Sequence, residues 1–431
     1  NGITVKCSGC SAGDTGYVRG VQYTAYDNTT LANKSIGDND WDRVVTSLVT
    51  DMSTLFMNYQ AFNQDISSWD TSNVTNMENM FSSAHVFDQD ISAWDVSNVT
   101  NMRRMFHDTR TFNQDLGSWD TSNVTNMNLM FGSSNFNNGD ASGVNSNTFN
   151  WDVSSVTNMS HMFGGCPRFN QDLSSWDVSS VTNMSNMLMA SNYRNGGQSL
   201  NSWNTSSVTN MSGMFRGSPF NEDISAWDVS NVTSFSDMFK QSGFNQDIGS
   251  WDVSQVTDMS RMFEQAYDFN QDIGAWDMSN VISTYGMFSN APDFNQDIGS
   301  WDVSSVQATL MRNMFYGAVS FNQDISGWCV SSITSEPDNF SNLSALTSIN
   351  KPVWGTCPSP TSNATLTISS SDSDNIITSG VVTLTATFSE NMAATPLISI
   401  AGLVTNTAMS QGSSAAQWTY YWPIPSSVTT G

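Results

Sequence analysis

Basic residues and long apolar runs are scarce in this 431-residue sequence. Lys and Arg number 14 against 39 Asp and Glu, which gives a formal net charge of -25 at pH 7. A surface of that sign repels phosphate backbones, so we expect no nucleic-acid partner. The sequence contains no run of eighteen apolar residues, so we expect no transmembrane helix and no membrane insertion.

Histidines and catalytic motifs are also scarce. The three histidines show neither HExxH spacing nor the arrangement of a catalytic triad. Neither a G-x-S-x-G motif nor a phosphate-cradling glycine loop occurs. Carboxylates are abundant because an acidic pattern recurs along the chain, which makes them weak evidence for a glycosidase pair. We therefore predict that the protein is not an enzyme.

What the sequence does contain is a repeated unit of about 25 residues. Its first full copy runs from Phe62 to Phe81 and reads FNQDISSWDTSNVTNMENMF. A tryptophan marks each copy: Trp69, Trp94, Trp119, Trp151, Trp176, Trp203, Trp227, Trp251, Trp276, Trp301 and Trp328. A short period held over this many copies predicts a solenoid, in which each unit buries its apolar side chains only against its neighbours.

Two rhythms within the unit predict its secondary structure. Apolar residues alternate over Ile66–Thr71, which is typical of the short strand of a leucine-rich repeat. Over Val74–Phe81 they recur three and four residues apart, which predicts about two turns of helix capped by the preceding Ser or Asn. The predicted fold is therefore a leucine-rich-repeat-like solenoid with one short parallel strand and one short helix per unit.

Four parts make up the predicted domain organisation. Residues 1–39 are expected to form an N-terminal β-hairpin leader, and residues 40–356 the solenoid with an atypical capping unit at each end. Residues 357–363, CPSPTSN, read as a linker. Residues 364–431 alternate like strands and predict an all-β immunoglobulin-like segment, partial because such a sandwich needs about a hundred residues. We interpret the chain as a piece of a longer, processed precursor.

The five cysteines predict little metal or redox chemistry. Cys329 and Cys357 lie about one repeat apart, a spacing that is compatible with a disulfide and does not require one. Cys7 and Cys10 form a CxxC pair without the second pair of a zinc site, so a local disulfide is expected there. Cys166 has no evident partner and is expected in the core.

The unit FNQDISxWDVSNVTNMxxMF resembles the repeat of the BspA-family leucine-rich repeat surface proteins, over roughly residues 40–354. The later segments FSENM, PLISIAGLV and QWTYYW resemble bacterial Ig-like modules of large adhesins. The resemblance implies a secreted, extracellular cell-surface adhesin of bacterial type, and it transfers neither a ligand nor any catalytic residue. Asn204, Phe235 and Cys329 depart from the pattern, which weakens the expectation that every unit makes the same contact.

The clearest candidate site is the column of aspartates that follow the tryptophans. Stacked coils would place like charges about 5 Å apart, which repel by roughly 1 to 3 kcal/mol per pair. Either a cation such as Ca²⁺ binds the column, or each carboxylate caps backbone N–H groups of the next turn. The candidate metal ligands are Asp70, Asp95, Asp120, Asp152, Asp177, Asp228, Asp252, Asp277 and Asp302.

A second aspartate column belongs to the FNQD stretch. Here the polar side chains are expected to satisfy backbone groups of a tight turn, with stacked Asn63, Asn113 and Asn170 as an amide ladder. Asp372 and Asp374 lie in the SDSDN stretch, which could either bind calcium or form a polar turn between strands. Calcium is therefore the one cofactor that the sequence suggests.

We predict a non-catalytic adhesion protein whose extended acidic solenoid face binds a glycan or a protein. The alternative is a structural subunit of an extracellular fibre, assembled when a neighbouring chain adds a strand to the Ig-like edge. A flat threonine ladder that binds ice or crystals is a more remote option. Thr71 and Thr121 alternate with Val96 and Val153 at the same unit position, which argues against a regular lattice match.

Overall fold

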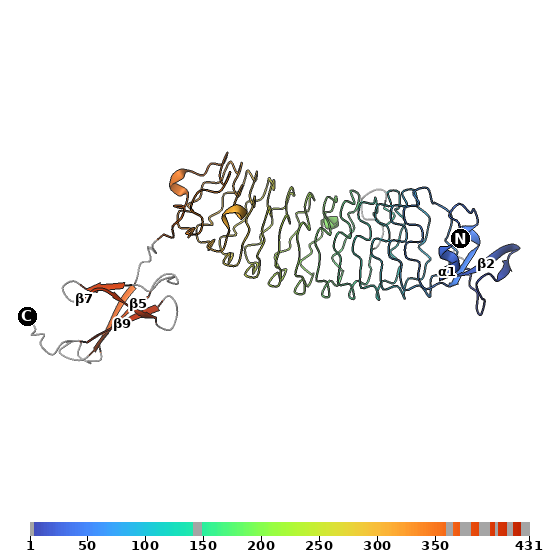
Figure 1. Cartoon of the computed structure of the whole chain (residues 1–431), viewed down its shortest axis with the longest axis horizontal. Coiled ribbons are helices and arrows are strands. Elements are labelled where there is room, and N and C mark those ends of the chain that lie inside the picture. Colours follow the sequence, from blue (N-terminus) through green and yellow to red (C-terminus); the bar gives the residue numbers. More distant parts are fainter. Residues whose placement is uncertain are drawn as a thin grey trace, which may run out of the picture. The chain divides into compact units, whose positions relative to one another are not determined.

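The computed structural model contains two compact units, Asn1–Cys357 and Pro358–Gly431. The structure describes residues 4–140, 149–358, 365–370, 381–387, 397–400, 404–411 and 417–423. The first unit is a row of stacked backbone coils that follow the sequence repeat, with the N-terminal strands at one end (Figure 1). Over the described residues, no helix is long and apolar enough to cross a membrane.

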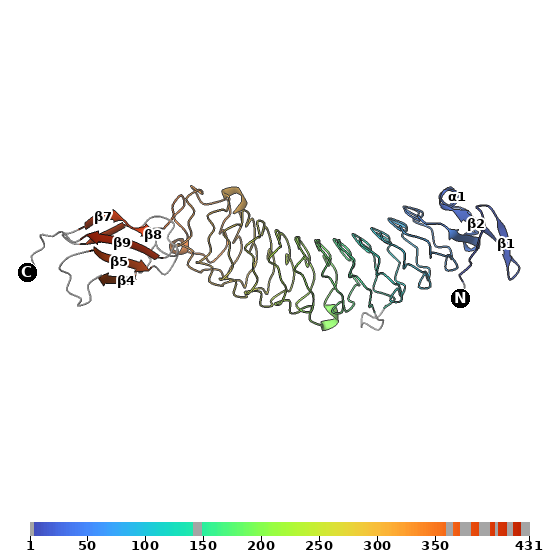
Figure 2. The same cartoon turned by 90° about the horizontal axis from the view of Figure 1, so that it is seen from below.

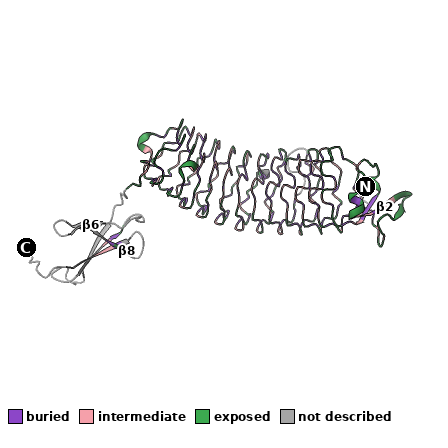
Figure 3. Cartoon of the chain, viewed as in Figure 1, coloured by how far each residue is buried: buried purple, intermediate pink, exposed green. Residues whose placement is uncertain are grey.

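A three-stranded sheet, ordered β1-β2-β3, closes the N-terminal end of the coils. β1 (Thr15–Val18) and β2 (Val21–Asp27) form an antiparallel hairpin, and β3 (Val44–Leu48) pairs in parallel with β2. Figure 3 shows the exposed residues of this hairpin in green. α1 (Asn28–Ala32) follows β2 and buries Leu31 in the main core. Leu31 and Trp41 belong to the same buried cluster as the apolar side chains of the coils, so this end of the chain packs on the first coils.

Within the coils, the described residues form turns and isolated bridges where a strand and a helix were expected. Ten successive coils each add one residue to a ladder of parallel bridges: Asp51, Asn76, Asn101, Asn126, Asn158, Asn183, Asn210, Ser234, Asp258 and Ser283. The remaining helical elements of the first unit are single 3-10 turns: η1 (Trp41–Arg43), η2 (Asn195–Gly197), η3 (Ala308–Leu310) and η4 (Ser348–Asn350).

The helix expected at Val74–Phe81 is replaced by turns because alternate N–H groups bond outside their own coil. The N–H of Asn79 donates to the Arg103 carbonyl of the next coil at 2.9 Å. An α-helix would keep all these bonds within one segment. Asn79 also has a φ of 57°, in the left-handed region that an α-helix does not contain. The same unit position is left-handed in the following coils, at Arg104, Leu129, His161 and Asn186.

Apolar side chains fill the coils as columns that run from one repeat to the next. The rings of Trp69 and Trp94 stack with centroids 6.1 Å apart, and those of Phe81 and Phe106 with centroids 5.5 Å apart. The unit's methionines are buried beside them. The indole N–H of Trp94 donates to the Ile66 carbonyl of the preceding coil at 3.2 Å, so burial leaves no unpaired indole there.

The structure decides the state of the five cysteines. Cys329 and Cys357 form a disulfide near the end of the coil stack. Cys7 and Cys10 are free thiols, so the expected local disulfide is not formed. The Cys10 thiol instead lies 3.8 Å from the Cys7 carbonyl, and the hydrogen bond with Cys7 raises the pKa of Cys10 to about 11. Burial raises the pKa of Cys166, a core residue as expected, to about 11.

The described strands of the second unit form two antiparallel sheets (Figure 2). The larger sheet has the order β4-β5-β9-β8, and the smaller one pairs β6 with β7. The strands are β4 (Thr365–Ser370), β5 (Val381–Thr387), β6 (Leu397–Ile400), β7 (Val404–Ala408), β8 (Ser410–Gln411) and β9 (Gln417–Pro423). Ala386, Met409 and Trp418 form a small buried cluster. The candidate calcium ligands Asp372 and Asp374 lie outside the described residues.

Candidate functional site

The short segment that links one repeat to the next varies in length, and a groove lies on the surface where several short segments follow one another. A link here means the residues between the side chain that ends the NMxxMF stretch and the aromatic residue that opens the next FNQD stretch. Three consecutive links, 189–192, 216–219 and 240–243, have four residues, whereas the flanking links 164–168 and 264–268 have five. A groove of about 710 Å³ lies over the shorter links. We call it the short-link groove.

A buried serine at the third position of each short link forms the floor of the groove. These serines are Ser191, Ser218 and Ser242. The Ser242 hydroxyl donates to the Phe239 carbonyl at 2.9 Å and accepts the N–H of Phe244 at 3.3 Å. In the flanking longer links, a main-chain carbonyl accepts the equivalent N–H. At Ser242 the hydroxyl therefore allows a shorter link to close without leaving a buried N–H unpaired.

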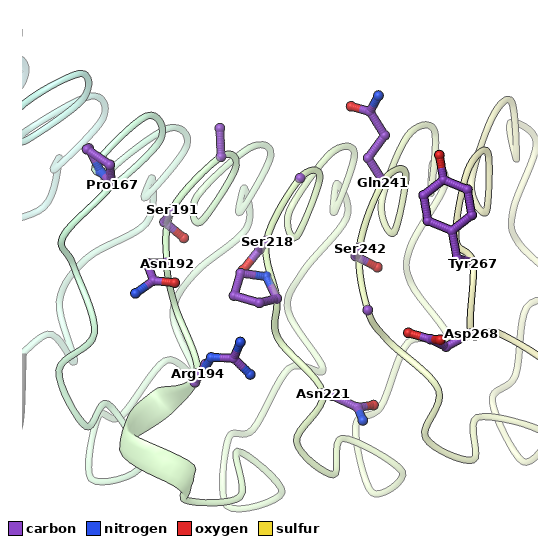
Figure 4. Close-up of a pocket in the computed structure, with 14 residues that line it drawn as sticks. Pro167, Ser191, Asn192, Arg194, Ser218, Asn221, Gln241, Ser242, Tyr267 and Asp268 are labelled. Atoms are coloured by element: carbon purple, nitrogen blue, oxygen red, sulfur yellow. The ribbon is translucent and has the colours of Figure 1, made fainter.

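The two ends of the groove carry different chemistry. Figure 4 shows Pro167 at one end and Tyr267 with Asp268 at the other, with the floor serines between them. The Tyr267 side chain is 58% exposed. An exposed tyrosine offers a flat apolar ring face with a hydrogen-bonding hydroxyl at its edge. This end can therefore hold the apolar face of a ligand that is otherwise polar.

Amide side chains and one arginine line the sides of the groove. Asn192, Asn221 and Gln241 are exposed. The Asn221 oxygen already accepts the N–H of Asn245 at 2.8 Å, and the Gln241 amide donates to Gln265 at 2.6 Å, so Asn221 offers its NH2 group as a donor and Gln241 offers its oxygen as an acceptor. The N–H of Arg194 donates to the Asn170 side-chain oxygen at 2.8 Å, which fixes the main chain there. Within the described part of the chain, the Arg194 guanidinium has no ion pair. The lining is therefore suited to a ligand with many hydroxyl or anionic groups.

The groove is not visible in the consensus of the repeated unit, because it arises where the copies differ from one another in length. The signal that could have found it is link length, seen by comparing RGSPF and KQSGF with EQAYDF. The groove lies where three shortened links follow one another. A single shortened link has full-length links on both sides, so it does not form a groove of this length. The serine at the third link position occurs in these three copies and also in the isolated short link 132–135, where it is Ser134.

The aspartates after the tryptophans bind their own coil. One oxygen of Asp120 accepts both the N–H of Ser122, at 3.1 Å, and its hydroxyl, at 2.6 Å. The corresponding serine hydroxyl and N–H lower the pKa of Asp120, Asp177 and Asp252 below the ordinary value of 3.8. This geometry fits the capping alternative, in which each carboxylate holds the turn that follows it.

Asp70, the first member of the column, differs from the rest because it is buried. Burial opposes its ionisation, but hydrogen bonds from Ser47 at 2.7 Å and from Ser72 at 2.6 Å outweigh burial and lower the pKa of Asp70. The Lys6 ammonium lies 3.2 Å from the same carboxylate. Asp70 therefore ties the N-terminal segment to the first full repeat.

The FNQD column also serves its own turns. Asp65 accepts the N–H of Ser67 at 2.9 Å, and an equivalent bond recurs at Asp90, Asp115, Asp172, Asp223, Asp247, Asp272, Asp297 and Asp324. Beside it runs a side-chain ladder in which Asn63 accepts the N–H of Asp88 and Asp88 accepts that of Asn113, at 3.0 Å each. Searching the described residues finds no group of three or more His, Cys, Asp or Glu placed to hold a metal ion.

The threonines weighed for lattice binding are not on the surface. Thr71 and Thr121 are buried and donate to the carbonyls of Asp95 and Asp152 at 2.9 and 2.7 Å. The exposed threonine column lies four residues further on, from Thr75. Its hydroxyls donate to the preceding coil at 3.2 Å, at Thr75, Thr100, Thr125, Thr157, Thr182, Thr209, Thr233 and Thr257. These hydroxyls therefore support the coil stack.

Comparison with known families finds one match. A family model described as "Mycoplasma protein of unknown function, DUF285" matches residues 22–143, 133–243, 189–292 and 241–354. The four overlapping segments together run from residue 22 to residue 354, well over half of the chain, and they follow the repeats. No curated protein and no solved structure matches the chain.

Proposed function

We propose a carbohydrate-binding function for this chain, which belongs to the family described as "Mycoplasma protein of unknown function, DUF285". In this proposal the protein is a secreted, extracellular adhesin of the BspA leucine-rich repeat type from a bacterial surface, and its coils are a solenoid scaffold. The ligand is a glycan chain held in the short-link groove. The observation that carries the proposal is the exposed Tyr267 at the end of a groove lined with amide side chains.

A glycan matches the groove in both chemistry and length. Sugar rings have an apolar C–H face, which packs on an aromatic ring, and a rim of hydroxyl groups, which pair with amides and carboxylates. Asn192, Asn221 and Gln241 supply the amides, and Asp268 supplies a carboxylate. The groove spans five coils from Pro167 to Tyr267, about 19 Å if coils stack at the usual strand spacing of about 4.8 Å. A chain of several sugar units fits that length.

The groove is equipped to bind a glycan rather than to hydrolyse it. Glycoside hydrolysis uses two carboxyl groups on either side of the scissile bond. Asp268 is the one carboxylate among the described lining residues. We therefore propose that this groove binds a glycan without cleaving it.

The second unit is proposed to be an Ig-like stalk, as its sequence pattern suggests. β4 lies at an edge of the larger sheet, and an edge strand can accept a strand from another chain. A fibre subunit therefore stays the alternative function. Sedimentation over a range of concentrations separates the two, because strand addition gives a ladder of oligomers whereas an adhesin stalk does not require one.

The test fills the groove without disturbing the coils. A Cβ at Gly243 would meet only the Asp268 carboxylate, at 3.9 Å, so Gly243→Trp places an indole in the groove without backbone strain. Gly37→Trp is the control, since Gly37 is exposed, far from the groove in sequence, and open at its Cβ position except for Ser35 at 3.8 Å. On an array of plant, algal and animal glycans, we expect binding by the wild type and by Gly37→Trp, and loss in Gly243→Trp. The proposal would be overturned if no glycan on the array bound the wild type and Gly37→Trp more strongly than Gly243→Trp.

A further inference from the structure

We propose that the glycan is anionic, a polysaccharide that carries sulfate or carboxylate groups. This inference rests on the proposed function and specifies its ligand. It comes from three arginines, Arg168, Arg194 and Arg216, that lie on three consecutive coils at the groove. Arg194 lines the groove, Arg168 follows the lining residue Pro167, and Arg216 precedes the lining residue Gly217.

These three arginines are exposed, and within the described residues none of them forms an ion pair. Most other cations on the repeats are neutralised. Arg103 lies 2.6 Å from Glu78, and Lys240 lies 2.9 Å from Glu264. Further pairs join Arg110 to Asp108 at 2.9 Å and Arg312 to Asp338 at 3.2 Å. From Phe62 to Trp354, the described cations without an ion pair are these three exposed arginines and the partly buried Arg104, so exposed unpaired positive charge on these coils is concentrated beside the groove.

The overall charge of the protein makes this concentration informative. With a net charge of -25, the molecule as a whole repels polyanions, so an anionic ligand needs a local positive region. An arginine without an intramolecular partner can bind an anion without first breaking an ion pair. Its planar guanidinium matches the paired oxygens of a sulfate or a carboxylate.

The positions of these groups suit a linear polymer. Consecutive coils are about 4.8 Å apart, so the three arginines lie on successive levels of the coil stack, each at a different position around its coil. In the order of the repeats, Tyr267 lies two coils beyond Arg216. Figure 4 shows Tyr267 at one end of the groove, where it can offer its ring to a sugar unit. Asp268 opposes an anionic ligand at that end. We therefore infer that the charged units of the polymer lie over the arginines and that a sugar face lies on the tyrosine.

The experiment uses three polymers with one backbone: dextran, carboxymethyl-dextran and dextran sulfate. Their dissociation constants are measured by biolayer interferometry with the full chain. The variant Arg168→Gln/Arg194→Gln/Arg216→Gln removes the arginines. The control, Arg19→Gln/Arg43→Gln, removes two exposed arginines of the N-terminal cap that likewise have no ion pair among the described residues.

We expect the wild type to prefer at least one charged polymer over dextran, and the groove triple variant to bind it roughly tenfold more weakly. Its affinity should also depend less steeply on salt, as fewer charge contacts form. The cap variant should bind like the wild type. Asp268→Asn should tighten binding, since it removes a repulsive charge. The better of sulfate and carboxylate identifies the anionic group.

Three results would overturn the inference, and they are distinguishable from failure of the glycan proposal. In the first, neutral glycans bind, Gly243→Trp abolishes this binding, and the triple variant leaves it unchanged. This result would support the glycan-binding proposal and contradict the proposal that the glycan is anionic. Equal weakening by the cap and groove variants would show non-specific charge attraction. Binding of none of the polymers, together with an empty glycan array, would reject both proposals.

Discussion

The hydroxyl of Ser242 accepts the N–H of Phe244 at 3.3 Å, and this contact closes one of the three consecutive short links under the groove. Ser242→Ala should therefore leave a buried N–H unpaired, which costs about 1 to 3 kcal/mol of unfolding free energy. Ser304→Ala is the matched control, because Ser304 is exposed and only its N–H, not its hydroxyl, is engaged by Asp302. Urea denaturation measures both. Equal stability of the two variants would contradict the role assigned to the hydroxyl.

Asn79 provides a test in which turn and helix predict opposite signs. At its φ of 57°, glycine is tolerated and alanine is strained, so Asn79→Gly should be neutral or stabilising and Asn79→Ala should destabilise by about 1 kcal/mol. In a helix, alanine would be the better residue by about 1 kcal/mol. Thermal unfolding of the two variants measures the difference. A more stable Asn79→Ala would show that this segment is helical after all.

Protonation of the aspartate column should weaken the fold in acid. Hydrogen bonds from serine lower the folded-state pKa of Asp120, Asp177 and Asp252 below 3.8. Their contribution is therefore complete above about pH 5 and is lost as the pH falls through 3.8 and below. The triple Asp→Asn variant should show a shallower loss of unfolding free energy between pH 5 and pH 3.

The repeat itself contains the precedent for that variant. Asn204 replaces the aspartate in one copy, and its side-chain oxygen still accepts the N–H of Ser206 at 3.2 Å and its hydroxyl at 2.7 Å. Asparagine at the three positions should therefore keep the turns folded at pH 7. An unchanged pH profile would mean that these carboxylates do not contribute to acid sensitivity.

Calcium distinguishes the two alternatives for the same column. Because the aspartate oxygens are engaged by serines of their own coil, we expect the unfolding midpoint to be the same in calcium and in magnesium at fixed ionic strength. A rise that is specific to calcium and is reversed by a chelator would require sites in the folded state. Asp→Asn variants in the column would then separate those sites from the SDSDN stretch, Asp372 and Asp374.

The content of the core could be predicted from the unit because its composition repeats. Trp69, Trp94 and their equivalents are buried in register, and the methionine stripe packs beside them. The helix could not be excluded in this way. The spacing of the apolar residues at Val74–Phe81 is compatible both with a helix and with a series of turns. Which of the two forms depends on whether the N–H groups bond to carbonyls of the next coil.

The site was predictable only in part. The aspartate columns could be recognised in the sequence, but the hydrogen-bond partners of the aspartates could not. In sequence, a carboxylate that accepts hydrogen bonds from a serine two residues later looks the same as one that binds a cation. The groove was not visible through residue type at all. Its lining combines common polar residues with Tyr267, and it exists because neighbouring short links lie side by side.

The sequence by itself determined the period, the residues of the core and the acidic balance of the surface, because each of these is a property of the repeated unit. Tertiary structure decided which backbone groups pair between coils, which hydroxyls and carboxylates are already engaged, and where three short links meet. Those outcomes depend on contacts about one repeat apart in the chain, and hydrogen-bond geometry across that separation is set only when the coils stack.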